Sequence, residues 1–117
     1  MFAGSVSDER KFQYLSNSDV FTLASWHEGF GLVFLEAMYS GLPIVASSAG
    51  GQAEFLVHER NALLFDPHDD VALSEALQRV LADRVLRERL AEASRQTLRE
   101  YYIDSIAARH LAIMRAV

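Results

Sequence analysis

Two short, strongly apolar runs on either side of a helical segment constrain the fold more than any other feature of the sequence. Residues 19–24 and 43–47 are rich in β-branched and aromatic side chains, the composition of buried strands. Between them, a glycine-containing loop leads into a helical pattern at about 31–40, which Gly41 and Pro43 would end. Two strands joined through a helix pair in parallel, so these residues predict one unit of a parallel α/β sheet.

The rest of the chain extends this unit without internal repeats or low-complexity linkers. We expect a helix over about 7–18, capped by its first serine, and a short third strand at 62–65. Helices would follow over 67–117, where apolar residues recur with a period of 3.6. The predicted organisation is one domain of 117 residues, with strand–helix units in 1–66 and C-terminal helices after them.

Several local expectations are more specific. Residues 2–4 read as the tail of a strand whose beginning is missing, 52–57 as a short helix, 59–61 as a turn, and 103–117 as a final helix. A shortened first strand implies a missing neighbour in the sheet. The predicted fold class is therefore α/β: a partial doubly wound, Rossmann-like three-layer domain with three to four parallel strands. One face of the first C-terminal helix would consist of Leu73, Ala76, Leu77, Val80 and Leu81.

Composition and charge exclude several classes of function. Half of the residues are apolar, so the chain can bury a core. The formal net charge is −5 and no basic stripe is present, which argues against a nucleic-acid partner. The chain has no cysteine, which excludes disulfides, zinc thiolate sites and thiol catalysis. No apolar run reaches about 18 residues and no signal-peptide pattern is present, so we expect a cytoplasmic protein without a transmembrane segment, with peripheral membrane association left open.

The loop and helix start within 27–38 have the chemistry of an anion site. Backbone N–H groups at a helix N-terminus attract phosphate, and Gly29 and Gly31 would let the backbone approach a ligand closely. Glu36 would lie one turn into the helix and lean back toward that end, where its carboxylate could accept two hydrogen bonds from a sugar diol. Taken alone, Glu36 could equally face solvent, and Glu28 could be an ordinary loop acid.

Four stretches taken together are much more specific. Residues 28–36 have the spacing Glu-x7-Glu, and residues 40–46 read Ser-Gly-Leu-Pro-Ile-Val-Ala. A Gly-Gly-Gln-Ala-Glu turn follows at 50–54, and Asn-Ala-Leu-Leu-Phe at 61–65. This series resembles the retaining GT-B glycosyltransferases of the family-4, glycosyl transferases group 1 type. The part it resembles is the second half of their C-terminal, donor-binding domain.

The resemblance implies an enzyme that transfers a hexose from a nucleotide-diphosphate sugar to an acceptor with retention of configuration. It implies no metal and no other cofactor, and it assigns no certain catalytic residue to this chain. By this resemblance, the donor sugar would be contacted by Glu28, Gly29, Phe30 and Gly31. The diphosphate would bind to the amides of Leu32 and Val33, and the ribose to Glu36. Four scattered histidines are expected in loops or packing and not as ligands: His27, His58, His68 and His110.

Two parts of such enzymes have no counterpart in this sequence. One is the N-terminal domain, which binds the acceptor and supplies a histidine, and the other is a basic pair that neutralises the diphosphate. No lysine or arginine lies between Lys11 and Arg60, so we expect weak donor binding and an isolated chain that is inactive. The missing domain, or another chain that replaces it, is then an expected partner besides the nucleotide-sugar.

Two other hypotheses follow from the same residues. The chain could be a non-catalytic half-Rossmann interaction module that completes its sheet by homodimerisation through an exposed edge or by docking onto another chain. It could also be a different nucleotide- or phosphate-binding α/β protein, which the generic strand, loop and helix start would allow.

Overall fold

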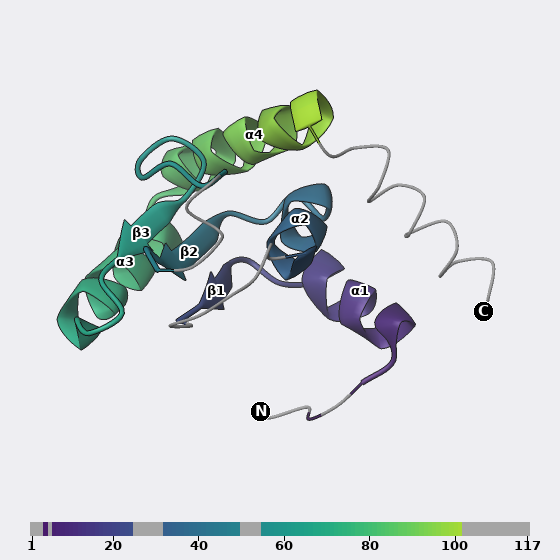
Figure 1. The fold of residues 1–117 in the computed structure, drawn as a ribbon, viewed down its shortest axis with the longest axis horizontal. Helices are drawn as coiled ribbons and strands as arrows, with labels where there is room; N and C mark the ends of the chain where they lie inside the picture. The colour runs from purple at the N-terminus through teal and green to yellow at the C-terminus, as the bar shows by residue number, and fades with distance from the viewer. Residues whose placement is uncertain (1–3, 5, 25–31, 50–54, 102–117) are drawn as a thin grey trace.

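The computed structural model describes residues 4, 6–24, 32–49 and 55–101, and the remaining residues lie outside that description (Figure 1). Short strands alternate with helices in the first part, as the sequence predicts, and two helices complete the part of the chain that the structure describes. The elements are α1 (Asp8–Ser16), β1 (Phe21–Leu23), α2 (Leu32–Tyr39), β2 (Ile44–Ser47), β3 (Leu63–Phe65), α3 (Asp70–Ala82) and α4 (Arg84–Tyr101).

The three strands form one parallel sheet in the order β1-β2-β3. Phe21 pairs with Ile44, and Val45 pairs with Leu63, so β2 is the central strand. Successive residues of a strand face opposite sides of the sheet. Accordingly, Ile44 and Ala46 belong to one buried apolar cluster and Val45 to another. A central strand that is buried on both faces is typical of a parallel sheet, and the predicted fold class is confirmed.

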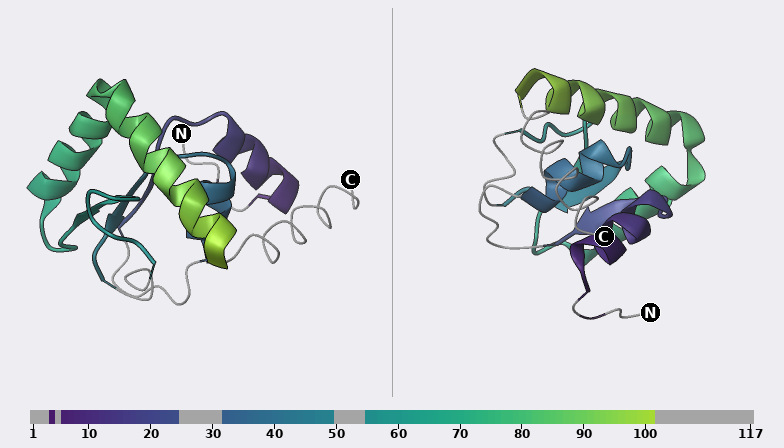
Figure 2. Two further views of the ribbon diagram at one scale, coloured as in Figure 1. Left: turned by 90° about the horizontal axis from the view of Figure 1, so that it is seen from above. Right: turned by 90° about the vertical axis from the view of Figure 1, so that its right-hand side faces the viewer.

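Helices cover both faces of the sheet, which gives three layers (Figures 1 and 2). Buried residues of α1 and α2 form the cluster on one face, and α3 packs on the other. The last helix among the described residues, α4, contacts both α2 and α3. It also lies against the segments that immediately precede β1 and β2, so it runs along the amino-terminal ends of the strands. The opposite, carboxyl edge of the sheet is where α2 begins.

The ends of α1 and α2 follow their predicted signals. Ser7 caps α1, because its hydroxyl accepts a hydrogen bond from the backbone N–H of Arg10 at 3.2 Å. Gly41 follows α2 in the left-handed conformation, with φ of 79°. The N–H of Leu42 then donates back to the carbonyl of Ala37 at 3.1 Å, which satisfies one of the last carbonyls of the helix.

The two C-terminal helices meet at Asp83, whose carboxylate accepts a hydrogen bond from the N–H of Leu86 at 3.0 Å. Arg87 of α4 donates to the carbonyls of Val80 and Leu81, at 2.9 and 2.7 Å, and so caps the end of α3. The predicted apolar face of α3 is correct for Val80, which is fully buried, but wrong for Leu81, which is 57% exposed. Adjacent helical residues are rotated by about 100°, which turns Leu81 away from the buried stripe.

Other local expectations have mixed outcomes. The predicted short helix at 52–57 is wrong for residues 55–57, which form a turn and a loop whose backbone groups bond to Asn61 and not along a helix. Gly4, the described end of the predicted first strand, is not in a strand. The turn at 59–61 is confirmed. The rest of these predictions lie outside the described residues, at 2–3, 52–54 and 103–117.

Asn61 ties the turn before β3 to α4. Its side-chain oxygen accepts a hydrogen bond from the N–H of Val57 at 2.7 Å. Its amide nitrogen donates to the carbonyl of Phe55 at 2.8 Å and to the hydroxyl of Thr97 at 3.1 Å. The hydroxyl of Ser94 donates to the Asn61 carbonyl at 2.9 Å. Asn61 is only 2% exposed, so water could not readily replace a partner lost from this network.

The first prediction concerns this network. Replacing Asn61 by alanine leaves the buried carbonyl of Phe55 and the partly buried N–H of Val57 without their partners, so Asn61→Ala should lower the free energy of unfolding by about 2–4 kcal/mol. Asn17→Ala is the matched control, because the Asn17 amide donates a single exposed hydrogen bond to Gln13 at 2.9 Å. It should cost under about 1 kcal/mol. Urea unfolding followed by circular dichroism measures both, and equal losses would contradict the assigned role of Asn61.

Candidate functional site

The predicted ligand edge lies where β1 ends and α2 begins. The carboxyl ends of parallel strands meet at one edge of a sheet, and open sheets of this kind bind ligands there. Leu32 and Val33 form the first turn of α2, in which backbone N–H groups lack partners within the helix. That position is compatible with the predicted diphosphate contact, which stays a prediction. The four residues predicted to bind the donor sugar, Glu28, Gly29, Phe30 and Gly31, lie outside the described residues.

Glu36 lies one turn further along α2 and is almost completely buried, with 1% of the residue exposed. Its neighbours Phe34, Leu35, Ala37 and Met38 are buried and apolar. The alternative in which Glu36 faces solvent is therefore wrong. The sequence could not decide between the two because α2 is apolar on nearly all sides, so its pattern marks no outer face. The predicted contact between Glu36 and a ribose stays a prediction.

A lysine from another helix supplies the counter-charge of this buried acid. The Nζ of Lys11, on α1, lies 2.9 Å from the Oε2 of Glu36, and 30% of the Lys11 side chain is exposed. The same Nζ lies 3.4 Å from the Oδ1 of Asp8, an exposed acid one turn away. In the sequence Lys11 stands out only as the chain's single lysine. Its role in the site depends on the packing of α1 beside α2, which local patterns do not encode.

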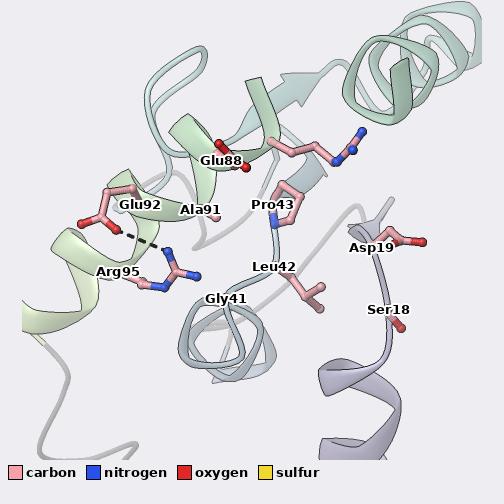
Figure 3. A pocket seen from close by; sticks show the side chains of 10 residues that line it. Ser18, Asp19, Gly41, Leu42, Pro43, Glu88, Ala91, Glu92 and Arg95 are labelled. Carbon is pink, nitrogen blue, oxygen red and sulfur yellow. Dashed lines mark hydrogen bonds and ion pairs between the residues drawn. The ribbon is translucent and has the colours of Figure 1, made fainter. Parts of the chain in front are cut away.

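A cleft of about 450 Å³ opens at the other edge of the sheet, between α4 and the segments that precede β1 and β2 (Figure 3). Asp19 lies on one side of it, and Glu92 and Arg95 of α4 form an ion pair on the other, at 3.3 Å (Figure 3). Charges of both signs line this cleft, so it offers no uniform field for an anion or a cation. It lies at the amino-terminal ends of the strands, on the opposite edge from the start of α2.

A comparison with protein families decides what kind of protein this is. The family described as glycosyl transferases group 1 matches residues 1–97. The chain belongs to this family. The matched region contains the whole described sheet, both residues of the Lys11–Glu36 pair, and the start of α2.

The named relatives of this group 1 chain are much longer than the chain. It is 41% identical over 93 residues to the lipopolysaccharide core biosynthesis glycosyltransferase LpsD of Rhizobium meliloti. That match covers 80% of this chain and 27% of the relative. The chain thus spans about a quarter of the length of that glycosyltransferase.

Solved structures agree with this assignment. Sucrose-phosphate synthase of Thermosynechococcus elongatus matches 99% of this chain and 29% of its own, with a TM-score of 0.82 and 33% identity. The C-terminal domain of the group 1 glycosyl transferase LpcC of Francisella tularensis matches 86% of this chain and 52% of its own, with a TM-score of 0.77 and 29% identity. Anabaena HepE in complex with UDP-glucose shares the fold at 24% identity and a TM-score of 0.72, over 90% of this chain and 29% of its own. The described sheet therefore corresponds to part of the C-terminal domain of a GT-B enzyme.

The two described histidines of this group 1 chain lie in loops. The Nδ1 of His58 accepts a hydrogen bond from the N–H of Leu64 at 2.9 Å, and His68 is exposed before α3. Among the described residues, no group of three or more acidic or histidine side chains is placed to hold a metal ion. No helix in the described part of the chain is both long and apolar enough to cross a membrane. The other two histidines, His27 and His110, lie outside the described residues.

An exposed charge cluster fastens the turn before β3 to the C-terminal helices. The carboxylate of Glu59 accepts two hydrogen bonds from the guanidinium of Arg79, one of them at 2.8 Å, and Arg89 lies 3.7 Å away. The Arg79 hydrogen bonds lower the pKa of Glu59 from its usual 4.5, assisted by the charges of Arg79, His58 and Arg89 and opposed by partial burial. Glu59 is 41% exposed, so solvent screening limits the stabilisation to about 1 kcal/mol or less.

The second prediction concerns the Lys11–Glu36 pair: removing the lysine should destabilise the fold more than removing the glutamate. Lys11→Met leaves a buried carboxylate without its cation and should lower the free energy of unfolding by about 2–4 kcal/mol. Glu36→Leu leaves a lysine that can turn to solvent and puts an apolar side chain among apolar neighbours, so it should cost under about 1 kcal/mol. Urea unfolding measures both variants. A smaller loss for Lys11→Met than for Glu36→Leu would contradict this account of the pair.

The third prediction is a pH dependence of the Glu59 cluster. A carboxyl whose pKa is lower in the folded state stabilises the fold at pH 7, and this contribution disappears as the pH falls below 4.5 and through the folded pKa. The cost of Glu59→Gln should therefore be up to about 1 kcal/mol at pH 7 and smaller at about pH 3. Glu88→Gln, which removes an exposed pair within α4, is the control and should cost about 0.5 kcal/mol or less at pH 7. A Glu59→Gln cost that is the same at both pH values would refute the cluster's contribution.

Proposed function

We propose that this chain is the nucleotide-sugar-binding part of a retaining GT-B glycosyltransferase of the family-4 type. The activity of the longer protein would be transfer of a hexose from a nucleotide-diphosphate sugar to an acceptor. The observation that carries the proposal is Glu36, a carboxylate buried one turn inside the helix that starts at the carboxyl edge of the sheet. A buried acid in that position contributes little to the stability of the fold, but its carboxylate can accept hydrogen bonds from the hydroxyl groups of a ligand.

The helix α2 would offer two different charges to a ligand. Its N-terminus carries roughly half a positive elementary charge and, at Leu32 and Val33, N–H groups that have no partner within the helix. Glu36, one turn on, carries a negative charge that repels phosphate but accepts hydrogen bonds from neutral hydroxyls. A nucleoside diphosphate has the matching parts, a diphosphate for the amides and a ribose diol for the carboxylate. Inorganic phosphate would match only the first part, which favours a nucleotide over a simple anion.

The proposed reaction replaces one bond at the anomeric carbon by another on the same face of the sugar. The bond from this carbon to the diphosphate oxygen breaks, and a bond from it to the acceptor oxygen forms. The proton of the acceptor hydroxyl passes to the leaving diphosphate. Glu28 and Glu36 then act by positioning the donor and by electrostatics, and neither forms a covalent intermediate. We propose no metal and no other cofactor for this step.

The complete reaction is proposed for a protein longer than these 117 residues. The chain spans 27% of LpsD, so the acceptor domain and the basic pair expected from the family would belong to other parts of the longer protein. Lys11 is already paired with Glu36, so it adds little net positive charge for a diphosphate. Donor binding by this chain should therefore be weak, and its expected partner is the acceptor domain. A cytoplasmic location stays a prediction.

A second function, the interaction module, rests on the open edge of the sheet. Among the described strands, β1 (Phe21–Leu23) pairs with β2 alone, so the other side of β1 could accept a strand from a second copy or from another chain. Light scattering and urea unfolding distinguish the two functions. A monomer that unfolds cooperatively would argue against an obligate partner.

The fourth prediction tests nucleotide binding. UDP, GDP and ADP, and then the corresponding sugar nucleotides, should shift the backbone amide NMR signals of Leu32 and Val33 at millimolar concentrations. Glu36→Gln should weaken binding of the nucleotide with the highest affinity about tenfold, because a charged hydrogen-bond acceptor becomes a neutral one. Glu75→Gln is the control, since Glu75 is exposed on α3, in the layer on the other side of the sheet. If none of these ligands moves the Leu32 and Val33 signals, the proposed binding function is wrong.

A further inference from the structure

The Lys11–Glu36 pair is poorly explained as a device for stability alone. Removing two charges from water costs several kcal/mol each, and apolar residues of similar size often stabilise a protein as well or better. The surroundings here would favour such a replacement, because every other described side chain of the buried face of α2 is apolar. A charged pair in this place is better explained by a ligand that needs the carboxylate.

The geometry allows the pair to persist when a ligand binds. A carboxylate has about four lone-pair positions, and the ammonium contact at 2.9 Å takes up only one of them. Lys11 reaches Glu36 from a different helix and is 30% exposed, so the pair lies at the margin of the α1–α2 interface and not in its centre. A hydroxyl approaching from this margin could share the carboxylate with the ammonium.

We infer that Lys11 is a positioning residue for the ribose of the donor nucleotide. Its ammonium compensates the charge of the buried Glu36 carboxylate and holds it in one orientation, from which it accepts the hydrogen bonds of the ribose diol. The inference rests on the proposed function and extends it to α1, which lies outside the Glu-x7-Glu segment. Lys11 acts on the ribose through Glu36, so its loss should affect only ligands that carry the ribose hydroxyls.

This selectivity makes the inference testable with two ligands. The ribonucleoside diphosphate with the highest affinity in the titration is compared with its 2′,3′-dideoxy form, by NMR titration at constant salt. The unmodified chain should bind the ribonucleotide about tenfold more tightly, as expected for hydrogen bonds to a charged group. Lys11→Gln should reduce this ratio to about twofold or less by weakening ribonucleotide binding, with dideoxynucleotide binding unchanged. Lys11→Arg, which keeps the charge, should retain most of the ratio.

The control is Arg10→Gln, which removes a positive charge from the neighbouring, exposed position of α1. It should leave the ratio near tenfold. A folded Lys11→Gln variant that keeps the full ratio would overturn the inference and leave Lys11 as a link between two helices. Equal weakening of both nucleotides would also overturn it, because Lys11 would then act on the diphosphate. If the unmodified chain shows no ribose preference, the assignment of Glu36 in the proposed function fails, and the role of Lys11 fails with it.

A second measurement does not depend on the folding of any variant. Because Lys11 is the only lysine, a sample labelled with ¹³C in lysine gives a single ε-methylene signal. This signal should move when the ribonucleotide binds, because the carboxylate beside the ammonium then takes part in new hydrogen bonds. It should move much less with the dideoxynucleotide. An ε-methylene signal that stays in place at saturating ribonucleotide would overturn the inference.

Discussion

A carboxylate without solvent must have a cation or hydrogen-bond donors beside it, and this requirement links the parts of the structure that matter for function. Glu36 lies on an apolar helix whose neighbouring side chains are buried, and Lys11 supplies a counter-charge to it from α1. The relative position of α1 and α2 is therefore part of the candidate site. A family signature that covers only the loop and α2 does not show this dependence.

The strand order and the position of the helices leave one edge of the sheet available to a ligand. The parallel order β1-β2-β3 places the start of α2 at the carboxyl edge. The long helix α4 lies against the other edge, where Asn61 and Ser94 fasten it to the turn before β3. The mixed charges of the cleft beside α4 agree with a packing role for that edge (Figure 3). The molecule thus has one edge covered by α4 and one edge at which the start of α2 and Glu36 form the candidate site.

Much of the fold can be predicted from local sequence signals such as helix caps and apolar periodicity. The features that cannot be predicted depend on contacts between residues far apart in the sequence. Gly41 ends α2 because only a left-handed residue closes that helix, and such a signal is readable from the chain alone. The helix predicted at 52–57 is wrong for 55–57 because their hydrogen bonds to Asn61 cannot be read from a linear pattern. The burial of Glu36 and its pairing with Lys11 could not be predicted for the same reason, since both depend on how two helices pack. The sequence motif indicates where the candidate site lies, and the packing of α1 beside α2 provides the cation that pairs with Glu36.

The central claim is that Glu36, held by Lys11, receives the ribose of a nucleotide at the carboxyl edge of the sheet. The most direct measurement is a crystal structure of the chain with the nucleoside diphosphate that binds most tightly. The account predicts ribose hydroxyl oxygens about 2.7 Å from the Glu36 carboxylate, with the Lys11 ammonium still in contact with it. A nucleotide bound at the α4 cleft, or one whose ribose lies away from Glu36, would contradict it.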